Sequence, residues 1–150
     1  MNMKRGNFLT NRTWFRYLIE DSDLILCHTS ALECLGLFCG YFNEYPVDVY
    51  AKAKGETNNI NYRIVDTFVG IETVQIDCLL CTSVNQTFND MLSLYGTPYE
   101  STVDEQALVE GLSNYYFSNG ESFEGLMIKL ESRERFDILK VWAMEYYSDN

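Results

Sequence analysis

Five cysteines and a single histidine are the residues of this chain whose chemistry first suggests a metal or redox site. Cys78 and Cys81 are separated by two residues, which is the spacing of one ligand pair in a structural zinc site. Further ligands would have to come from Cys27, His28, Cys34 and Cys39. The last two are poorly spaced for a second pair. Cys78 and Cys81 also lie in an apolar run, where cysteine behaves as a small hydrophobic residue. We therefore expect no metal and no cofactor.

A lone histidine also limits acid–base chemistry. His28 directly precedes Thr29 and Ser30 at a predicted helix start, a position that favours a loop histidine near a helix cap over a general base. The glycines give no phosphate-binding loop, because Gly36 and Gly40 fit neither the P-loop nor the dinucleotide pattern. We therefore predict no catalytic residue.

Two aspartates could take part in metal-dependent nucleotidyl transfer, which needs clustered carboxylates to hold two Mg²⁺ ions. Enzymes of that type combine a Gly-Ser turn, an Asp-x-Asp/Glu strand and a third acid on a later strand. Here Leu37 follows Gly36 where serine would be needed. Tyr50 stands two residues after Asp48, so one acid of the close pair is missing, and Asp77 remains as the later acid. This pattern predicts weak or absent metal binding. It leaves a degenerate or active nucleotidyltransferase-like nucleotide-binding protein as the alternative function.

The formal net charge of −11 is unevenly distributed along the chain. An acidic surface repels phosphates, so we do not expect nucleic-acid binding over most of the molecule. The first 20 residues are an exception with a balance of +3, from Lys4, Arg5, Arg12 and Arg16 against Glu20. A nucleic-acid-associated regulator that uses this basic segment together with Trp14 and Tyr17 stays open as a further alternative.

The length predicts one domain over residues 1–150. A hydrophobic content of 47% is typical of a folded globular chain. No stretch approaches the roughly 18 apolar residues of a membrane-spanning helix, and the first ten residues do not resemble a secretory signal. An odd number of cysteines without such a signal favours reduced thiols. These features predict a cytoplasmic chain with no membrane partner.

The segment 70–96 is the predicted centre of the fold. A β-branched strand over 71–77 leads through the apolar run 78–81 into a helix that Ser83 and Gln86 cap and that ends at Gly96. Before it we expect a helix over 11–21, a short strand over 24–27, and a helix that Ser30 and Glu33 cap and that stops near Gly40. Strands over 46–51 and 60–68 follow, joined by a hairpin loop over 52–59. Short polar links between strands predict an antiparallel meander.

Residues after Pro98 show helical periodicity. We expect a helix over 102–117 capped by Thr102 and Glu105, a second over 123–130, and a third over 134–147 whose Phe136, Leu139 and Trp142 point inward. The predicted fold class is α+β: a small, mostly antiparallel sheet of three to four strands with N-terminal helices and a C-terminal helical bundle.

Two segments carry a resemblance to a known family. They are CHTSALECLGLFCGYFNEYPVDVY (27–50) and GIETVQIDCLLCTSVNQTFNDMLSLYG (70–96). The first is similar to a Ser-Ala-Leu helix followed by Gly-Leu, proline and a strand. The second is similar to a strand and a Thr-x-x-Arg-Thr-Leu-x-Asp-Leu helix, with Gln86 where arginine is usual. Over residues 24–145 the chain thus resembles the C-terminal domain of AbiEi-family antitoxins, from type IV abortive-infection toxin–antitoxin systems.

The resemblance implies a bacterial, non-catalytic antitoxin-like or defence-associated regulatory domain. Such a domain works in phage defence and neutralises a nucleotidyltransferase-like toxin, usually without a stable complex. Full-length members also carry an N-terminal winged helix-turn-helix, and the 23 residues before the matched region are too few for one, so we do not expect operator binding.

The expected partner is therefore a protein, either the cognate toxin or a host or phage factor, and the oligomeric state is open. Candidate contact residues are basic or aromatic: Arg12, Arg16, Tyr17, Tyr41, Phe42 and Tyr45. The alternative is that these aromatics pack the first helix onto the sheet.

Overall fold

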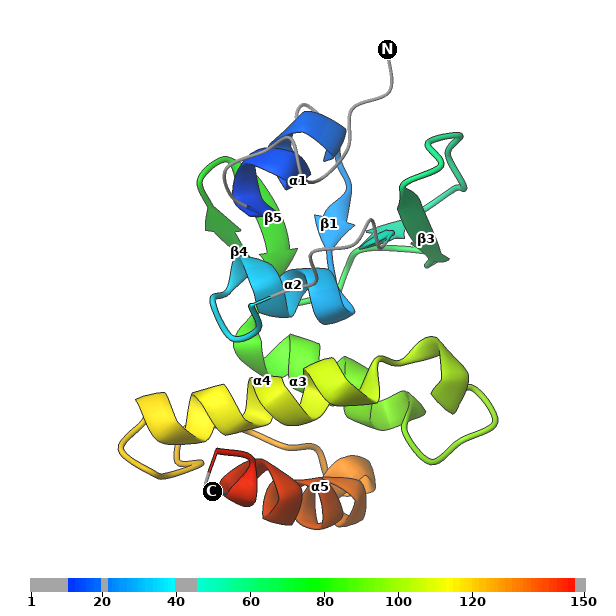
Figure 1. Cartoon of the computed structure of the whole chain (residues 1–150). Helices are drawn as coiled ribbons and strands as arrows, with labels where there is room; N and C mark the ends of the chain where they lie inside the picture. Colours follow the sequence, from blue (N-terminus) through cyan, green and yellow to red (C-terminus); the bar gives the residue numbers. More distant parts are fainter. Residues whose placement is uncertain (1–10, 20–21, 40–45, 148–150) are drawn as a thin grey trace.

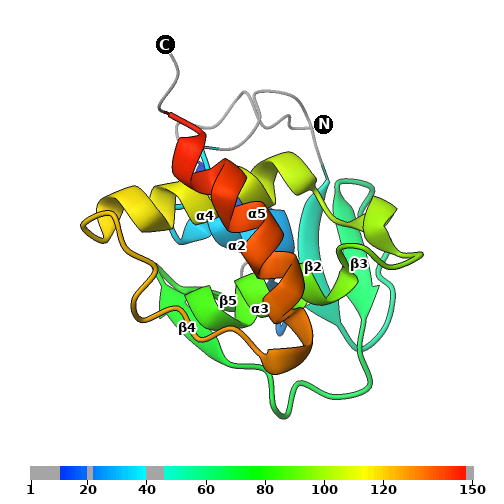
Figure 2. The same ribbon diagram turned by 90° about the horizontal axis from the view of Figure 1, so that it is seen from below.

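A computed structural model describes residues 11–19, 22–39 and 46–147, and it has a mixed α/β fold (Figure 1). A sheet and α1 form one half of the molecule, and α3, α4 and α5 form the other, with α2 between them (Figures 1 and 2). The elements in chain order are α1 Asn11–Ile19, β1 Ile25–Leu26, α2 His28–Cys34, β2 Val47–Ala51, β3 Ile60–Ile64, β4 Thr73–Ile76, β5 Leu79–Thr82, α3 Val84–Leu94, η2 Glu100–Thr102, α4 Glu105–Ser118, η3 Leu130–Ser132 and α5 Arg133–Glu145.

All residues of the short helix α2 are buried, and the helix contributes side chains to two hydrophobic clusters. Ala31 and Cys34 pack with α1 and the sheet, whereas Leu32 packs with α3, α4 and α5. The helix ends earlier than expected. Gly36 takes a φ of 79°, and the Leu37 N–H returns to the Leu32 carbonyl at 2.8 Å, the hydrogen bond of a glycine-terminated helix.

The predicted cap of α2 is wrong. Cys27 occupies the cap position, and the Ser30 hydroxyl instead accepts a hydrogen bond from the backbone N–H of Asp48 at 2.9 Å. Ser30 therefore ties α2 to β2, a tertiary role that a local capping pattern does not distinguish from a cap.

The sheet has five strands in the order β3-β2-β1-β5-β4 and is mixed, so the prediction of three or four antiparallel strands is wrong in detail. β1 pairs antiparallel with β2 and parallel with β5, and β4 pairs antiparallel with β5. β2 and β3 are parallel, which corrects the predicted hairpin over 52–59. A five-residue strand is about 16 Å long, and an eight-residue link can span up to about 26 Å, so this link is long enough to return.

The central segment contains a hairpin that we did not expect. Asp77 and Cys78 both have positive φ, 48° and 69°, so they form a tight turn between β4 and β5 instead of continuing one strand. One half of the capping box that follows is confirmed, because the Ser83 hydroxyl accepts from the Gln86 N–H at 3.1 Å at the start of α3. The other half is wrong, because the Gln86 side chain accepts from the Glu72 N–H at 2.9 Å, and the Ser83 N–H donates to the Glu72 carbonyl.

Two predictions for the C-terminal half are wrong, one for the cap of α4 and one for the buried face of α5. The cap of α4 is Asp104, whose carboxylate accepts from the Ala107 N–H at 3.0 Å, and not Thr102. The buried face of α5 is Phe136, Leu139 and Ala143, whereas Trp142 lies on the outer side.

Residues 123–129 are not helical, because side-chain amides of α3 form hydrogen bonds with backbone groups of this segment. Asn85 accepts from the Met127 N–H at 2.8 Å. Asn89 donates to the Met127 carbonyl and accepts from the Lys129 N–H, both at 2.8 Å. These bonds hold the segment in an extended form along α3. Within the described ranges, every helix is too short or too polar to cross a bilayer.

Candidate functional site

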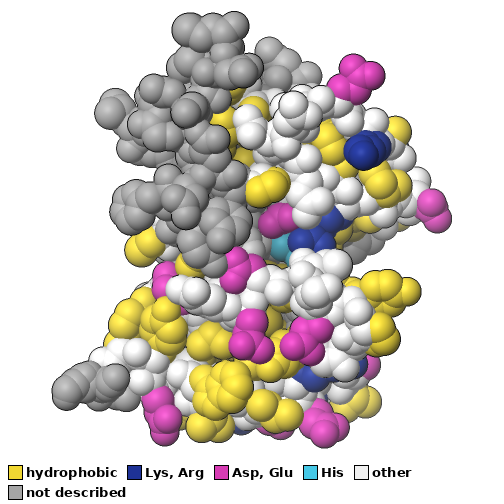
Figure 3. Space-filling view, turned by 45° about the vertical axis from the view of Figure 1, so that its right-hand side comes forward, with side chains coloured by type: hydrophobic (Ala, Val, Ile, Leu, Met, Phe, Trp, Pro, Cys, Tyr) yellow, Lys and Arg dark blue, Asp and Glu magenta, His cyan; other side chains and the backbone are white. Residues whose placement is uncertain are grey.

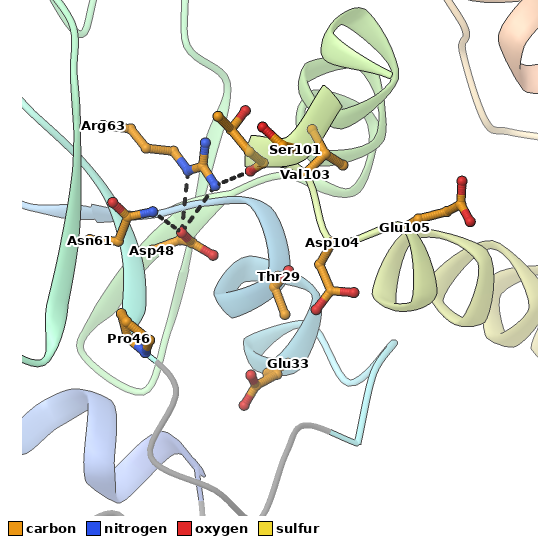
Figure 4. Close-up of a pocket in the computed structure, with 11 residues that line it drawn as sticks. Thr29, Glu33, Pro46, Asp48, Asn61, Arg63, Ser101, Val103, Asp104 and Glu105 are labelled. Carbon is orange, nitrogen blue, oxygen red and sulfur yellow. Dashed lines mark hydrogen bonds and ion pairs between the residues drawn. The ribbon is translucent and has the colours of Figure 1, made fainter. Parts of the chain in front are cut away.

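A cleft of about 470 Å³ opens between the β2–β3 edge of the sheet and the start of α4 (Figures 3 and 4). It is lined from the sheet by Pro46, Asp48, Asn61 and Arg63, from α2 by Thr29 and Glu33, and from the α4 side by Ser101, Thr102, Val103, Asp104 and Glu105. Most of these groups are polar. We call this set the sheet-edge cleft.

A buried ion pair forms one wall of the sheet-edge cleft. The Asp48 carboxylate accepts from the Asn61 amide at 2.8 Å and lies 3.2 Å from a terminal guanidinium nitrogen of Arg63. The parallel register places Asp48 beside Asn61 and Tyr50 beside Arg63, so alternation brings all four side chains to one face. Burial raises the pKa of Asp48, while the Arg63 charge and the Asn61 hydrogen bond oppose that rise.

The same arginine links the sheet to the helical half. The Arg63 guanidinium also donates to the Thr102 carbonyl at 2.6 Å. Arg63 therefore has acceptors on both sides, which makes it a bridge across the cleft and leaves its charge largely neutralised by Asp48.

His28 lies at the junction of β1 and α2 in a conformation that is unusual for a histidine, with φ at 50°. Its Nε2 lies 3.4 Å from the Tyr50 hydroxyl, and that hydroxyl donates to Asp90 at 2.7 Å. Gln86 donates to the other Asp90 oxygen at 2.8 Å. Since the one Tyr50 proton goes to Asp90, His28 must donate from Nε2, and its Nδ1 is then an acceptor.

That acceptor is buried and has no hydrogen-bond partner among the described residues. Burial, followed by the positive charge of Arg63, lowers the pKa of His28 to about 3. The imidazole is therefore neutral at pH 7. Ser113 Oγ and Ser132 Oγ are buried in the same way without a hydrogen-bond partner in the part of the chain that the structure describes, so the feature is not particular to His28.

The two aspartates considered for nucleotidyl transfer are not brought together. Asp48 lies beside the end of β1, because its carbonyl accepts from the Cys27 N–H at 3.0 Å. Asp77 precedes β5, which runs parallel to β1, so it lies at the opposite end of the sheet, separated from Asp48 by at least the length of β5, about 10 Å along the strands. Asp77 pairs instead with Arg12 at 3.4 Å. Two catalytic metal ions sit about 4 Å apart, so these carboxylates cannot hold one such pair.

The cysteines are also dispersed. Cys78 is exposed in the β4–β5 turn, while Cys34 and Cys81 are buried in the sheet cluster. A hydrogen bond with Cys34, and then burial, raise the pKa of the Cys81 thiol, so it stays protonated. In the part of the chain that the structure describes, no three His, Cys, Asp or Glu side chains are grouped to hold a metal ion.

Of the predicted contact residues, those on α1 can be placed. Arg12 donates to the Cys34 carbonyl at 2.8 Å and so closes the end of α2, in addition to its pair with Asp77. Arg16 lines a second cleft beside it. Tyr17 is exposed and stacks on the buried Trp14. The other three residues, Tyr41, Phe42 and Tyr45, lie outside the described residues.

Sequence reasoning missed one surface altogether. On the outer side of α5, Ile138, Val141 and Trp142 are 53%, 49% and 51% exposed. We call these three residues the α5 stripe. The signal was present, because this helix has more large apolar residues than its buried face of Phe136 and Leu139 can account for.

The chain was compared with known proteins, and no family model and no curated protein matches it. The likeness to AbiEi-family antitoxins therefore rests on the two sequence segments alone.

Proposed function

We propose that this chain is a non-catalytic, antitoxin-like or defence-associated regulatory domain that acts in the cytoplasm through contacts with a protein partner. The observation that carries the proposal is the α5 stripe. Its members lie within about one turn of each other, since residues three and four apart share a helix face. Together they present an apolar surface with tryptophan at one end.

The α5 stripe is not needed to pack the domain. Phe136, Leu139 and Ala143 already bury the opposite side of α5 in the helical cluster. Large apolar groups that remain in water after the core is complete are typical of protein interaction sites. Tryptophan is enriched among residues that dominate binding energy, so Trp142 is the expected anchor.

Charge indicates the kind of partner. Residues 100–150, which contain α4 and α5, hold eleven acids and four bases, a balance of −7. Complementary charge speeds association and suppresses wrong partners. The partner should therefore present an apolar patch within a basic surface.

The alternative functions gain less support. For the nucleotidyltransferase-like alternative, the sheet-edge cleft is rich in carboxylates, which repel a nucleoside triphosphate. Asp48 and Asp77 also lie at opposite ends of the sheet. For the nucleic-acid alternative, the Arg12 guanidinium is already bonded to the Cys34 carbonyl and Asp77.

Co-expression tests the proposal. The chain is expressed together with a nucleotidyltransferase-like toxin of a type IV abortive-infection system, and surviving colonies are counted against an empty vector. We expect survival to rise when the chain is present. If cells die as readily with the chain as without it, the proposal is wrong. Calorimetry with ATP or GTP and Mg²⁺ tests the nucleotide-binding alternative. The absence of a heat of binding at millimolar nucleotide would eliminate that alternative.

A further inference from the structure

Two buried thiols on the far side of α2 from the helical half lie against each other. Cys34 is the last residue of α2, Cys81 lies in β5, and α2 packs on β5. Both side chains are fully buried in the same hydrophobic cluster, and their thiols are hydrogen-bonded to each other. A disulfide needs the two β-carbons about 4 Å apart, so two thiols in contact need only a small adjustment to bond. Cys78, the partner that sequence spacing suggests for Cys81, is instead exposed in the β4–β5 turn.

The second observation is an arginine beside one of the two thiols. The Arg12 guanidinium donates to the Cys34 carbonyl from two nitrogens, at 2.8 and 3.3 Å, and it also hydrogen-bonds the Cys34 sulfur. The Arg12 side chain is 43% exposed. It lines the second cleft, of about 530 Å³, together with Glu33 and Gly36, which are close to Cys34 in the chain. The buried Cys34 thiol therefore lies beneath a side chain that reaches solvent.

These contacts make the two thiols chemically unequal. The hydrogen bond from Cys81 lowers the pKa of Cys34, an effect that burial opposes and the Arg12 charge reinforces. The same hydrogen bond, followed by burial, raises the pKa of Cys81. Because the thiolate and not the thiol attacks an oxidant, Cys34 is the thiol that reacts first. Cys81 is then in place as the second thiol that closes the disulfide.

We propose that Cys34 and Cys81 form a reversible disulfide on reaction with hydrogen peroxide, with Cys34 as the sulfur that is oxidised first. In the first step the Cys34 sulfur attacks one peroxide oxygen and the O–O bond breaks. The leaving hydroxide takes the proton that the Cys34 thiol has given up, so water leaves and Cys34 becomes a sulfenic acid. In the second step the Cys81 sulfur attacks the Cys34 sulfur, the S–O bond breaks, and the leaving hydroxide takes the Cys81 proton. The sum is two thiols and one peroxide giving one disulfide and two waters.

The disulfide would tie the end of α2 to the sheet. A low-molecular-weight thiol reverses it by thiol–disulfide exchange, and in a reducing compartment such bonds are transient and regulatory. The inference does not depend on the antitoxin proposal, and either can fail alone.

Cys27 supplies a matched comparison for the test. It is as deeply buried as Cys34, but burial and the Asp48 charge raise its pKa. The exposed thiols are first removed by Cys39→Ser and Cys78→Ser. One equivalent of hydrogen peroxide is then added at pH 7, samples are alkylated at intervals, and cleavage after Glu33 separates Cys27 from Cys34 for mass spectrometry.

We expect peptides joined through Cys34 and Cys81 and lighter by two hydrogens, which dithiothreitol separates again. Cys34 should be oxidised at least about 10-fold faster than Cys27, the change in thiolate fraction for one pKa unit. Recovery of Cys34 and Cys81 as thiols, or oxidation of Cys27 at the same rate as Cys34, would overturn the proposal.

Two further arms test the order of the steps and the role of the fold. In the same background, Cys81→Ser removes the second thiol, so Cys34 should stop at the sulfenic acid and be trapped by dimedone. A folded Cys81→Ser protein without a dimedone adduct on Cys34 would contradict the first step. In the background protein unfolded by urea, Cys27 and Cys34 should react at equal rates. A Cys34 advantage that persists in urea would come from its sequence neighbours and would refute the structural argument.

Discussion

The lowered pKa of His28 predicts a specific loss of stability in acid. Its value in the folded protein is about 3, against 6.5 for an unperturbed histidine. Between these two values the unfolded chain binds more protons than the folded one, so the free energy of unfolding falls as the pH falls through this range. The loss begins near pH 6.5 and would be complete near pH 3.

The size of the effect follows from the two pKa values. At pH 5 the unfolded histidine is about 1.5 pH units below its own pKa, while the folded histidine is still neutral. At about 1.4 kcal/mol per unit, His28 should lower the free energy of unfolding by about 2 kcal/mol between pH 7 and pH 5.

Two carboxyl groups act in the opposite direction. Burial raises the pKa of Asp48 and of Asp90, so the folded state gains protons there as the pH falls and is stabilised. The histidine contribution is therefore isolated by comparison with His28→Asn. Asparagine does not titrate and tolerates a positive φ better than most residues, so it suits this position.

Urea unfolding of both proteins at pH 7 and pH 5 measures the difference. The wild type should lose about 2 kcal/mol more than His28→Asn over this interval, with unchanged denaturant slopes. An equal pH dependence in the two proteins would refute the reasoning. NMR gives an independent check, because a folded His28 that titrates near pH 6.5 would contradict the burial of a neutral ring.

Three further predictions concern stability. Replacing Arg63 with methionine strands the buried Asp48 carboxylate and should cost about 3 kcal/mol in urea unfolding, and a second change, Asp48→Asn, should recover part of that loss. Asn89→Ala removes the bridge from α3 to the extended segment after α4 and should cost about 1–3 kcal/mol and speed proteolysis there, whereas Asn58→Ala in an exposed loop should change neither. Gly36→Ala places a side chain at a φ of 79° and should lower thermal stability by about 1 kcal/mol although the space around it is open, and an unchanged melting temperature would contradict the strain argument.

Local patterns in the sequence predicted those elements whose signals are local. The helix at residues 11–19 and the Ser83 cap follow from apolar spacing and from a hydroxyl placed just before a helix. The strand Val47–Ala51 follows from alternation. Each of these depends on neighbours within a few residues, so the sequence suffices.

Several failures involve partners far apart in the chain. Asn85 and Asn89 hold a segment about 40 residues later, and this overrides its helical spacing. The β4–β5 turn has cysteine where glycine would have signalled a positive φ. Pairing of β2 with β3 in parallel depends on the path of a polar loop, which periodicity does not encode.

The candidate site was beyond the reach of sequence for the same reason. His28 and Asp48 were each singled out, but their polar surroundings come from β3, α3 and the start of α4. The α5 stripe was visible as surplus apolar residues, yet only the packed fold shows which side of α5 is left in water.

The central claim is that the chain works by contact and not by carboxylate chemistry. Survival of cells that co-express the toxin separates the two when three variants are compared at equal protein levels. Trp142→Ser removes the anchor of the α5 stripe, Asp48→Asn removes the carboxylate with the best claim to chemistry, and Tyr99→Ser removes an exposed aromatic elsewhere as a control. We expect only Trp142→Ser to abolish protection. Protection that survives Trp142→Ser but is lost in a folded Asp48→Asn protein would contradict that claim.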